Sequence, residues 1–292
     1  MTNELASSSG TITIGGDLTI NRIGYGAMRL TGPSAWGEPA DPDTAIAVLR
    51  CAVERGINLI DTADYYGPYI ANRLITEALY PYPDELVIAT KVGAQRGNDK
   101  SWQPAARPVE LRNAVEDNLS RLRLERLDLV HFRFADGRSM PTTDVPVAES
   151  LGAMADLQKE GKVRHVGVSC VSAKQVEEAQ RIIEVTSVEN LYNLTERVSQ
   201  DVLDLCTREA IAFLPYFPLA IGELAKSRGL VAVIAERHGV APAQIALAWL
   251  LSISPVTIPI PGTSNVTHLE QNIEAGSVHL EKEEIDALRH LI

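Results

Sequence analysis

Two features of the sequence predict an α/β fold, a single (β/α)8 (TIM) barrel: eight apolar segments recur along the chain, and the loops between them are unequal in length. The segments alternate with amphipathic stretches that are typical of helices, an order that indicates a parallel sheet. Eight repeats favour a closed barrel, although an open doubly wound sheet also fits that count. The expected strands lie at 23–28, 57–61, 86–91, 127–132, 163–169, 186–191, 211–216 and 256–260.

Local signals place the other elements in order. Residues 11–20 alternate in polarity around a glycine-rich turn and predict an N-terminal β-hairpin. Asp41 is expected to cap a helix over 43–55, with Pro42 at the first helical position. No linker interrupts the pattern, so we expect one domain over 1–292. Later helices are indicated by Ser172 with Gln175, a capping-box pattern, by Pro242 with a helix running to residue 251, and by the amphipathic stretch 281–291.

Loop lengths decide between the barrel and the open sheet. The links from helix to strand at Gly56 and Gly161 are short, whereas the links from strand to helix at 29–42, 92–108 and 134–146 are long and rich in Gly and Pro. Enzymes with this barrel build their sites from the loops at the carboxyl ends of the strands. The asymmetry therefore favours the barrel and predicts a functional site at that end.

Composition excludes several classes of function. The net charge of −11 makes a nucleic-acid or anionic-membrane partner unexpected, and any anionic ligand must be held by local groups. Cys51, Cys170 and Cys206 are odd in number and far apart, so neither a disulfide framework nor a zinc site is indicated. Residues 1–10 lack the features of a signal peptide, and no apolar run approaches the roughly 20 residues of a membrane span. We expect a soluble, cytoplasmic protein; the sequence indicates no oligomeric state.

The chemically informative residues follow two neighbouring strands. The stretch 61–67 begins with Asp61 and contains Tyr66, and the next strand ends at Lys91. Adjacent strand ends would bring these side chains together. A free tyrosine titrates near pH ~10, but a neighbouring ammonium favours the phenolate and lowers that pKa, while a carboxylate keeps the lysine charged. The set is suited to acid–base chemistry; the alternative is that Asp61 and Lys91 pair for stability alone.

These residues resemble the motif of the aldo-keto reductase family, and the similarity extends along nearly the whole chain, most closely to a bacterial branch of pyridoxal reductases. The resemblance implies Tyr66 as general acid, Asp61 and Lys91 as its supporters, an extended NADPH across the barrel top, and reduction of an aldehyde or ketone to an alcohol without a metal. The matching stretches are Asp61-Thr62-Ala63-x-x-Tyr66-Gly67 with Thr90-Lys91, Gly24-Tyr25-Gly26-Ala27-Met28, 164–169, Tyr216-Phe217-Pro218-Leu219 and 258–263.

One departure from the family concerns the fourth catalytic position. The family usually places a histidine five residues after the aspartate of its fourth strand, and counting from Asp128 that position holds Arg133. His131 lies two residues earlier, and residues i and i+2 share a face of a strand. Arg133 is the preferred replacement, because it could orient a carbonyl or phenolate oxygen by paired hydrogen bonds; His131 is the alternative, or else a packed barrel residue.

The expected cofactor site also departs from the family pattern. Cys170 replaces the usual Asn, Glu189 replaces the usual Gln, and Gly262 and His268 stand where many members have Lys and Arg. The resemblance still favours NADP(H), with weak discrimination against NAD(H). The residues expected to bind the cofactor are Ala27, Met28, Asp61, Ser169, Cys170, Glu189, Tyr216, Phe217, Pro218, Leu219, Pro261, Gly262, Thr263, Ser264, Asn265, His268, Gln271 and Asn272.

Two tryptophans in the expected loops are candidate substrate contacts. Trp36 and Trp102 lie in long loops and could form aromatic walls for a flat small-molecule carbonyl substrate such as pyridoxal, or simply anchor their own loops.

A second enzymatic hypothesis makes Lys91 the Schiff-base lysine of an aldolase or lyase. A third is a cofactor-binding regulatory barrel, since some such relatives lack the catalytic histidine. The intact set of Asp61, Tyr66 and Lys91 favours the reductase.

Overall fold

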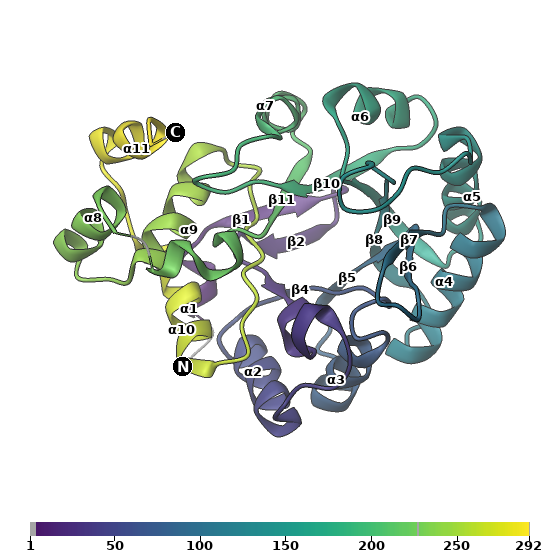
Figure 1. The fold of residues 1–292 in the computed structure, drawn as a ribbon, viewed down its shortest axis with the longest axis horizontal. Coiled ribbons are helices and arrows are strands. Elements are labelled where there is room, and N and C mark those ends of the chain that lie inside the picture. Colours follow the sequence, from purple (N-terminus) through teal and green to yellow (C-terminus); the bar gives the residue numbers. More distant parts are fainter. Residues whose placement is uncertain (1–3, 227, 292) are drawn as a thin grey trace.

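Parallel strands and the helices between them form a ring in the computed structural model, which describes residues 4–226 and 228–291 (Figure 1). Seven strands pair in the order β11-β10-β9-β8-β5-β4-β3, and each neighbouring pair is parallel. The barrel prediction is thus confirmed. The strands are β3 (Tyr25–Gly26), β4 (Leu59–Asp61), β5 (Val87–Val92), β8 (Leu127–Arg133), β9 (Val163–Ser169), β10 (Val185–Leu191) and β11 (Ala212–Tyr216).

The eighth expected strand, 256–260, closes the ring without forming a regular ladder. Two backbone hydrogen bonds join it to Phe213 of β11, both 2.8 Å long. On its other side the carbonyl groups of Pro259 and Pro261 accept hydrogen bonds from the backbone N–H groups of Gly24 and Gly26. Proline has no N–H to donate, so the segment bonds both neighbours but is not a regular strand.

Helices cover the outside of the ring, and the expected start signals are in place. Asp41 caps α2 by accepting a 3.1 Å hydrogen bond from the backbone N–H of Thr44. Ser172 and Gln175 form the expected capping box of α6. The helices are α1 (Glu4–Ser7), α2 (Pro42–Glu54), α3 (Ile70–Leu79), α4 (Pro108–Leu122), α5 (Val147–Lys159), α6 (Ala173–Gln180), α7 (Gln200–Glu209), α8 (Leu230–His238), α9 (Pro242–Ile253), α10 (Val266–Glu274) and α11 (Lys282–Arg289).

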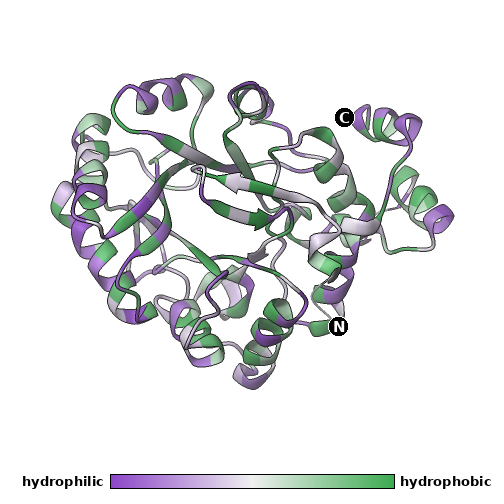
Figure 2. Ribbon diagram, turned by 180° about the vertical axis from the view of Figure 1, so that it is seen from behind, coloured by the Kyte–Doolittle hydropathy of each residue, from purple (hydrophilic) through white to green (hydrophobic). Residues whose placement is uncertain are grey.

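The predicted hairpin, β1 (Thr11–Ile14) and β2 (Leu18–Asn21), lies across the amino end of the barrel. Figure 2 views the molecule from behind and shows the hairpin in front of the strands. Its buried face packs into the apolar lower layer of the barrel interior, so this end is filled. That cluster consists of Ile14, Leu18, Ile20, Leu59, Val87, Ala89, Leu129, Ala212, Leu214, Ile258 and Ile260.

The upper layer of the barrel interior is polar. Strand residues two apart share a face, so Lys91 projects above Ala89 on β5. The pairing register sets Lys91 opposite His131 of β8, and Glu189 of β10 opposite Ser169 of β9. The long loop after β5 contains a small hairpin that the sequence did not predict, β6 (Ala94–Arg96) and β7 (Trp102–Pro104).

A larger apolar core lies between the strands and the surrounding helices, and it includes the fully buried Leu49, Leu74 and Trp249. None of the helices within residues 4–226 and 228–291 is long and apolar enough to cross a membrane. The assignment of one domain to 1–292 stays a prediction.

The hairpin's packing yields a stability prediction. Ile20 is fully buried against the lower layer, so Ile20→Ala leaves a cavity and is expected to lower the free energy of unfolding by about 2–5 kcal/mol. Urea denaturation followed by circular dichroism measures this. The control is Thr19→Ala on the exposed face of the same strand, which should cost no more than about 0.5 kcal/mol. Equal midpoints for the two variants would contradict the role assigned to the hairpin.

Candidate active site

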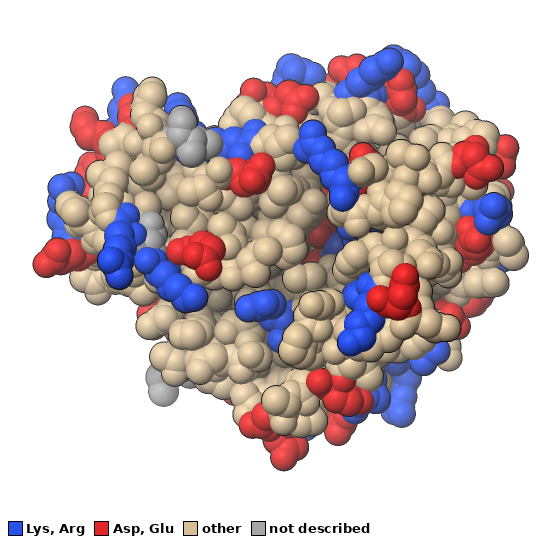
Figure 3. Space-filling view, viewed as in Figure 1, with Lys and Arg blue, Asp and Glu red and all other residues tan. Residues whose placement is uncertain are grey.

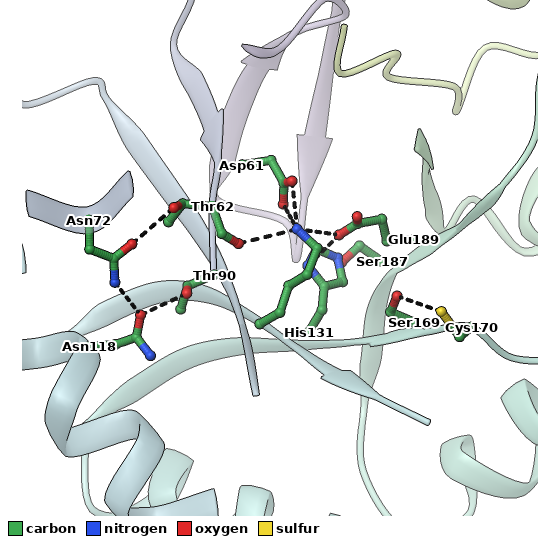
Figure 4. A network of polar contacts seen from close by, with 11 residues as sticks. Asp61, Thr62, Asn72, Thr90, Asn118, His131, Ser169, Cys170, Ser187 and Glu189 are labelled. Atoms are coloured by element: carbon green, nitrogen blue, oxygen red, sulfur yellow. Dashed lines mark hydrogen bonds and ion pairs between the residues drawn. The ribbon is translucent and has the colours of Figure 1, made fainter. Parts of the chain in front are cut away.

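The structure brings Asp61, Tyr66 and Lys91 together at the carboxyl ends of β4 and β5. All three are buried, and the Lys91 ammonium donates to both carboxylate oxygens of Asp61 at 2.5 Å and to the Thr62 carbonyl at 3.2 Å (Figure 4). Burial alone lowers the pKa of Lys91, but the charges of Asp61 and Glu189 outweigh it and raise that pKa well above its usual value. Lys91 is therefore a permanent positive charge inside the barrel.

Tyr66 lies beside this charge, with its ring centroid 5.4 Å from the Lys91 Nζ atom. Burial raises the pKa of Tyr66 to about 12; Lys91 lowers the pKa, and the charges of Asp61 and Glu189 raise it. The expected net lowering of this pKa is therefore wrong, because loss of solvent outweighs the ammonium. At neutral pH Tyr66 holds its proton and can act as a donor.

Glu189 is a second carboxyl group on the same lysine, a contact that the sequence argument missed. Its Oε2 atom lies 3.2 Å from the Lys91 Nζ atom and 3.5 Å from the His131 Nδ1 atom (Figure 4). Burial and the charge of Asp61 raise the pKa of Glu189 to about 8. Glu189 is therefore mostly protonated at neutral pH, which limits the negative charge around Lys91. The available signal was that Glu189 stands where the resemblance to the family predicts a glutamine.

The two candidates for the fourth position occupy different surroundings. His131 is fully buried, its Nε2 atom lies 2.9 Å from the Ser187 hydroxyl, and burial followed by the Lys91 charge lowers its pKa to about 3. Arg133 is half-buried at the end of β8, and its Nη2 atom donates to the Ser139 hydroxyl at 2.9 Å. The structure thus places a neutral imidazole inside the barrel and a charged guanidinium at its mouth.

The barrel interior also has a grouping that could hold a cation. Atoms of Asp61, His131 and Glu189 lie within 4.8 Å of one another, a spacing compatible with a metal ion. The Lys91 ammonium contacts both carboxyl groups of this set. Lys91, a residue of the chain itself, therefore already supplies a positive charge at the grouping that could hold a cation.

A buried chain of amides and hydroxyls supports the lysine from the helix side. The Thr62 hydroxyl donates to Asn72 at 2.9 Å, the Asn72 amide donates to Asn118 at 2.9 Å, and the Thr90 hydroxyl donates to the same Asn118 oxygen at 2.8 Å (Figure 4). Thr62 presents its carbonyl to Lys91, and Thr90 precedes Lys91 in the chain. The network therefore ties the ends of β4 and β5 to helices α3 and α4.

A cavity of about 540 Å³ opens beside Tyr66 and has room for an extended ligand. Most of the expected cofactor residues line it; Ala27, Ser169 and Cys170 do not. The lining also contains Arg29 and Lys226, two basic side chains that the sequence argument missed. The lining residues that were expected are Met28, Asp61, Glu189, Tyr216, Phe217, Pro218, Leu219, Pro261, Gly262, Thr263, Ser264, Asn265, His268, Gln271 and Asn272.

The donors in this cavity fit a nicotinamide dinucleotide. Asn265 caps α10 by accepting from the backbone N–H of His268 at 3.0 Å, which places a helix N-terminus at the wall, and such ends favour phosphate. Arg29, Lys226 and His268 add basic groups, and Tyr216 offers an aromatic face to a flat ring.

Trp36 and Trp102 do not line this cavity. The guanidinium of Arg96 lies over both indole rings, 5.2 Å from the centroid of Trp36 and 4.2 Å from that of Trp102. The Trp102 ring is also 5.4 Å from the ring of Tyr65, edge to face. Both tryptophans thus belong to a stacked cluster beside the loop of Tyr66; their role as substrate walls stays a prediction.

The raised pKa of Glu189 has a consequence for stability. The folded protein keeps this proton up to pH about 8, whereas a glutamate in the unfolded chain releases it near pH ~4.3. The contribution of Glu189 to the free energy of unfolding is therefore complete below pH ~4.3 and is lost as the pH rises through 8. Glutamine does not titrate, so the Tm of Glu189→Gln minus that of the wild type should become more positive between pH 5 and pH 9. Differential scanning calorimetry at each pH measures the Tm of the variant and that of the wild type.

The control for this experiment is Glu177→Gln, which removes an exposed carboxyl group from α6. Its Tm difference from the wild type should stay flat over the same range. A flat difference for Glu189→Gln as well would mean that Glu189 is ionised throughout, contrary to the structure.

Comparison with known proteins is consistent with this geometry. A sequence model described as the aldo/keto reductase family matches residues 22–292. Pyridoxine 4-dehydrogenase of Escherichia coli is 44% identical over 281 residues, covering 96% of this chain and 98% of that protein. An uncharacterized oxidoreductase of Schizosaccharomyces pombe is 42% identical over 278 residues, covering 95% of this chain and 88% of that protein.

Solved structures agree in fold. An aldo/keto reductase from Klebsiella pneumoniae, in complex with NADP and acetate, superposes with a TM-score of 0.81 at 26% identity, covering 96% of this chain and 94% of that one. The glycerol dehydrogenase AKR11B4 from Gluconobacter oxydans gives a TM-score of 0.84 at 25% identity, covering 97% of this chain and 96% of that one.

Proposed function

Because the chain belongs to the aldo/keto reductase family, it is an NADP(H)-dependent carbonyl reductase, and we propose that Tyr66 supplies the proton of that reaction to an aldehyde of the pyridoxal type. The observation that carries the assignment of Tyr66 is its phenol group, protonated at neutral pH, beside both the cavity and the buried Lys91 charge.

The chemistry follows from the charges around Tyr66. Bound NADPH supplies the hydride for the carbonyl carbon. The Tyr66 hydroxyl donates its proton to the carbonyl oxygen, which gives the alcohol and leaves a phenolate, and a proton from water later restores the tyrosine. The Lys91 ammonium stabilises that phenolate by charge, and Asp61 keeps Lys91 in place.

The cofactor would lie in the cavity of about 540 Å³. We assign its flat ring to the region of Tyr216 and Glu189, and its phosphate groups to the α10 end with Arg29, Lys226 and His268. Ser169 and Cys170 stay proposed contacts, since they flank this region at the end of β9 without lining the cavity.

We propose Arg133, rather than His131, for the fourth position. His131 is neutral and its Nε2 atom already contacts the Ser187 hydroxyl, whereas Arg133 is charged and lies near the end of the barrel that holds Tyr66.

The aldolase alternative lacks support from the geometry: the Lys91 ammonium is buried, bonded to Asp61 and strongly basic, which makes it a poor nucleophile. A purely regulatory barrel would have no chemical need for the Asp61, Lys91 and Tyr66 set.

A pyridoxal-like substrate is supported by the similarity to pyridoxine 4-dehydrogenase at 44% identity.

We also propose that the protein is located in the cytoplasm. This location is supported by Cys51, Cys170 and Cys206, which are all free thiols in the structure, as is usual in a reducing compartment.

The central prediction for this function concerns Tyr66→Phe. Loss of the proton donor should lower kcat for NADPH oxidation with pyridoxal, followed at 340 nm, by at least about 100-fold. The affinity for NADPH, measured by fluorescence titration, should stay close to that of the wild type.

The matched control is Tyr82→Phe, which removes a hydroxyl that donates to the Leu122 carbonyl and contacts the Thr76 hydroxyl; Tyr82 does not line the cavity. Its turnover should equal that of the wild type. Full activity in Tyr66→Phe would remove Tyr66 from the reaction, and NADPH binding without turnover by the wild type would support the regulatory barrel.

Cofactor preference yields a further prediction. His268 is an exposed side chain at the cavity wall, where an arginine could bind a phosphate by paired hydrogen bonds. His268→Arg should therefore raise the ratio of kcat/KM for NADPH to that for NADH by about ten-fold. An unchanged ratio would place the additional phosphate of NADPH away from His268.

A further inference from the structure

We propose that a basic and aromatic wall beside Tyr66 binds an anionic oxygen on the substrate ring, so that the enzyme prefers aromatic aldehydes with an ionised oxygen to neutral ones. The wall consists of Trp36, Tyr65, Arg96, Trp102 and Arg133. This inference rests on the proposed carbonyl reduction and names its substrate class.

The wall is a continuous stack that ends at the proton donor. Arg96 lies between Trp36 and Trp102, at 5.2 and 4.2 Å from their ring centroids. Arg133 follows, 5.0 Å from the ring centroid of Trp102 and 5.9 Å from that of Tyr65. The Tyr65 ring is 5.4 Å from the Tyr66 ring, so the stack reaches the catalytic phenol.

Backbone contacts join the Trp36 end of the wall to the loop of Tyr66 and hold Arg96 in place. Trp36 forms a parallel bridge with Gly67, the residue that follows Tyr66. Trp102 lies on β7, whose partner β6 carries Arg96. The Arg96 guanidinium donates to the carbonyl groups of Ser34, Ala35 and Lys100, which fixes it between the two indole rings.

No carboxylate of the described residues forms a direct ion pair with Arg133, whose charge acts on Glu189 only at longer range and lowers the pKa of that carboxyl group. Its Nη2 atom donates to Ser139, whose hydroxyl in turn donates to Asp136, so that carboxylate is reached only through Ser139. The buried Nε atom of Arg133 makes no well-aligned hydrogen bond. The polar neighbour of this guanidinium is the hydroxyl of Tyr65, which is neutral and is therefore no ionic partner. A half-buried guanidinium without an ionic partner favours an anionic ligand.

Arg96 likewise bonds only backbone carbonyls within 4–226 and 228–291, and the nearby Asp99 accepts hydrogen bonds from Ser101 instead. Two guanidinium groups therefore face one indole ring, in a protein of net charge −11. On the face seen in Figure 3 acidic and basic side chains are interspersed and form no broad basic patch. An anionic substrate must rely on this local charge.

The shape of the wall selects a flat anion. A guanidinium donates in a plane that suits carboxylate or phenolate oxygens, and indole faces stack on aromatic rings. An aromatic aldehyde with an ionised oxygen could engage both while its carbonyl meets Tyr66. We expect the charge to be worth at least about ten-fold in kcat/KM.

The test compares 2-, 3- and 4-carboxybenzaldehyde with the matching formylbenzamides, which are neutral and nearly the same shape. The readout is kcat/KM for NADPH oxidation by the wild type, Arg133→Gln and Arg138→Gln. In the wild type at least one acid should exceed its amide by about ten-fold or more, and Arg133→Gln should abolish that ratio. Arg138→Gln removes an exposed charge five residues further on and should keep the ratio.

Each outcome separates the proposals. No acid preferred over its amide, or an equal loss for acid and amide in Arg133→Gln, would overturn the wall as an anion site. Failure of the wild type on every aldehyde would overturn the carbonyl reduction instead. In that case quenching of tryptophan fluorescence by benzoate, but not by benzamide, still tests the wall: it must occur in the wild type and be lost in Arg133→Gln.

Discussion

The buried ammonium of Lys91 is the interaction on which the rest of the site depends. A charge inside the barrel is tolerated only when opposite charges and hydrogen bonds replace water, and here Asp61 and the Thr62 carbonyl do so, with Glu189 as a mostly protonated neighbour. Asp61 comes from β4, which neighbours β5, and Glu189 comes from β10, which is separated from β5 by β8 and β9. Closure of the barrel is what brings these strands within reach of one lysine.

That requirement explains the division of the barrel interior into two layers. The lower layer is apolar and packed against the N-terminal hairpin, so it lies between the ion pair and the amino end of the barrel. The upper layer is polar and opens to the cavity beside Tyr66. In the proposed function three positive regions have different roles: Lys91 stabilises the phenolate, Arg29 and Lys226 are assigned to the cofactor phosphates, and Arg133 is assigned to the substrate.

Much of this could be predicted from sequence because it depends on strand order. The hairpin follows from alternating polarity around a glycine-rich turn, and the barrel from eight repeats with loops of unequal length. The convergence of Asp61, Tyr66 and Lys91 follows from their places near the ends of neighbouring strands. Other features depend on burial or on loop paths, which local patterns do not specify. The net rise in the Tyr66 pKa needed the extent of burial, the Glu189 contact needed the register across the barrel, and the β6–β7 hairpin with its Arg96 stack needed the path of a long loop.

The most direct test of this account is the turnover of Lys91→Met, measured as NADPH oxidation with pyridoxal at saturating cofactor. Because Lys91 does not line the cavity, NADPH should bind nearly as in the wild type, while turnover should fall at least about 100-fold. The double variant Asp61→Asn/Lys91→Met removes both charges and checks that any loss does not come from an unpaired carboxylate. Turnover close to that of the wild type in either folded variant would contradict the account.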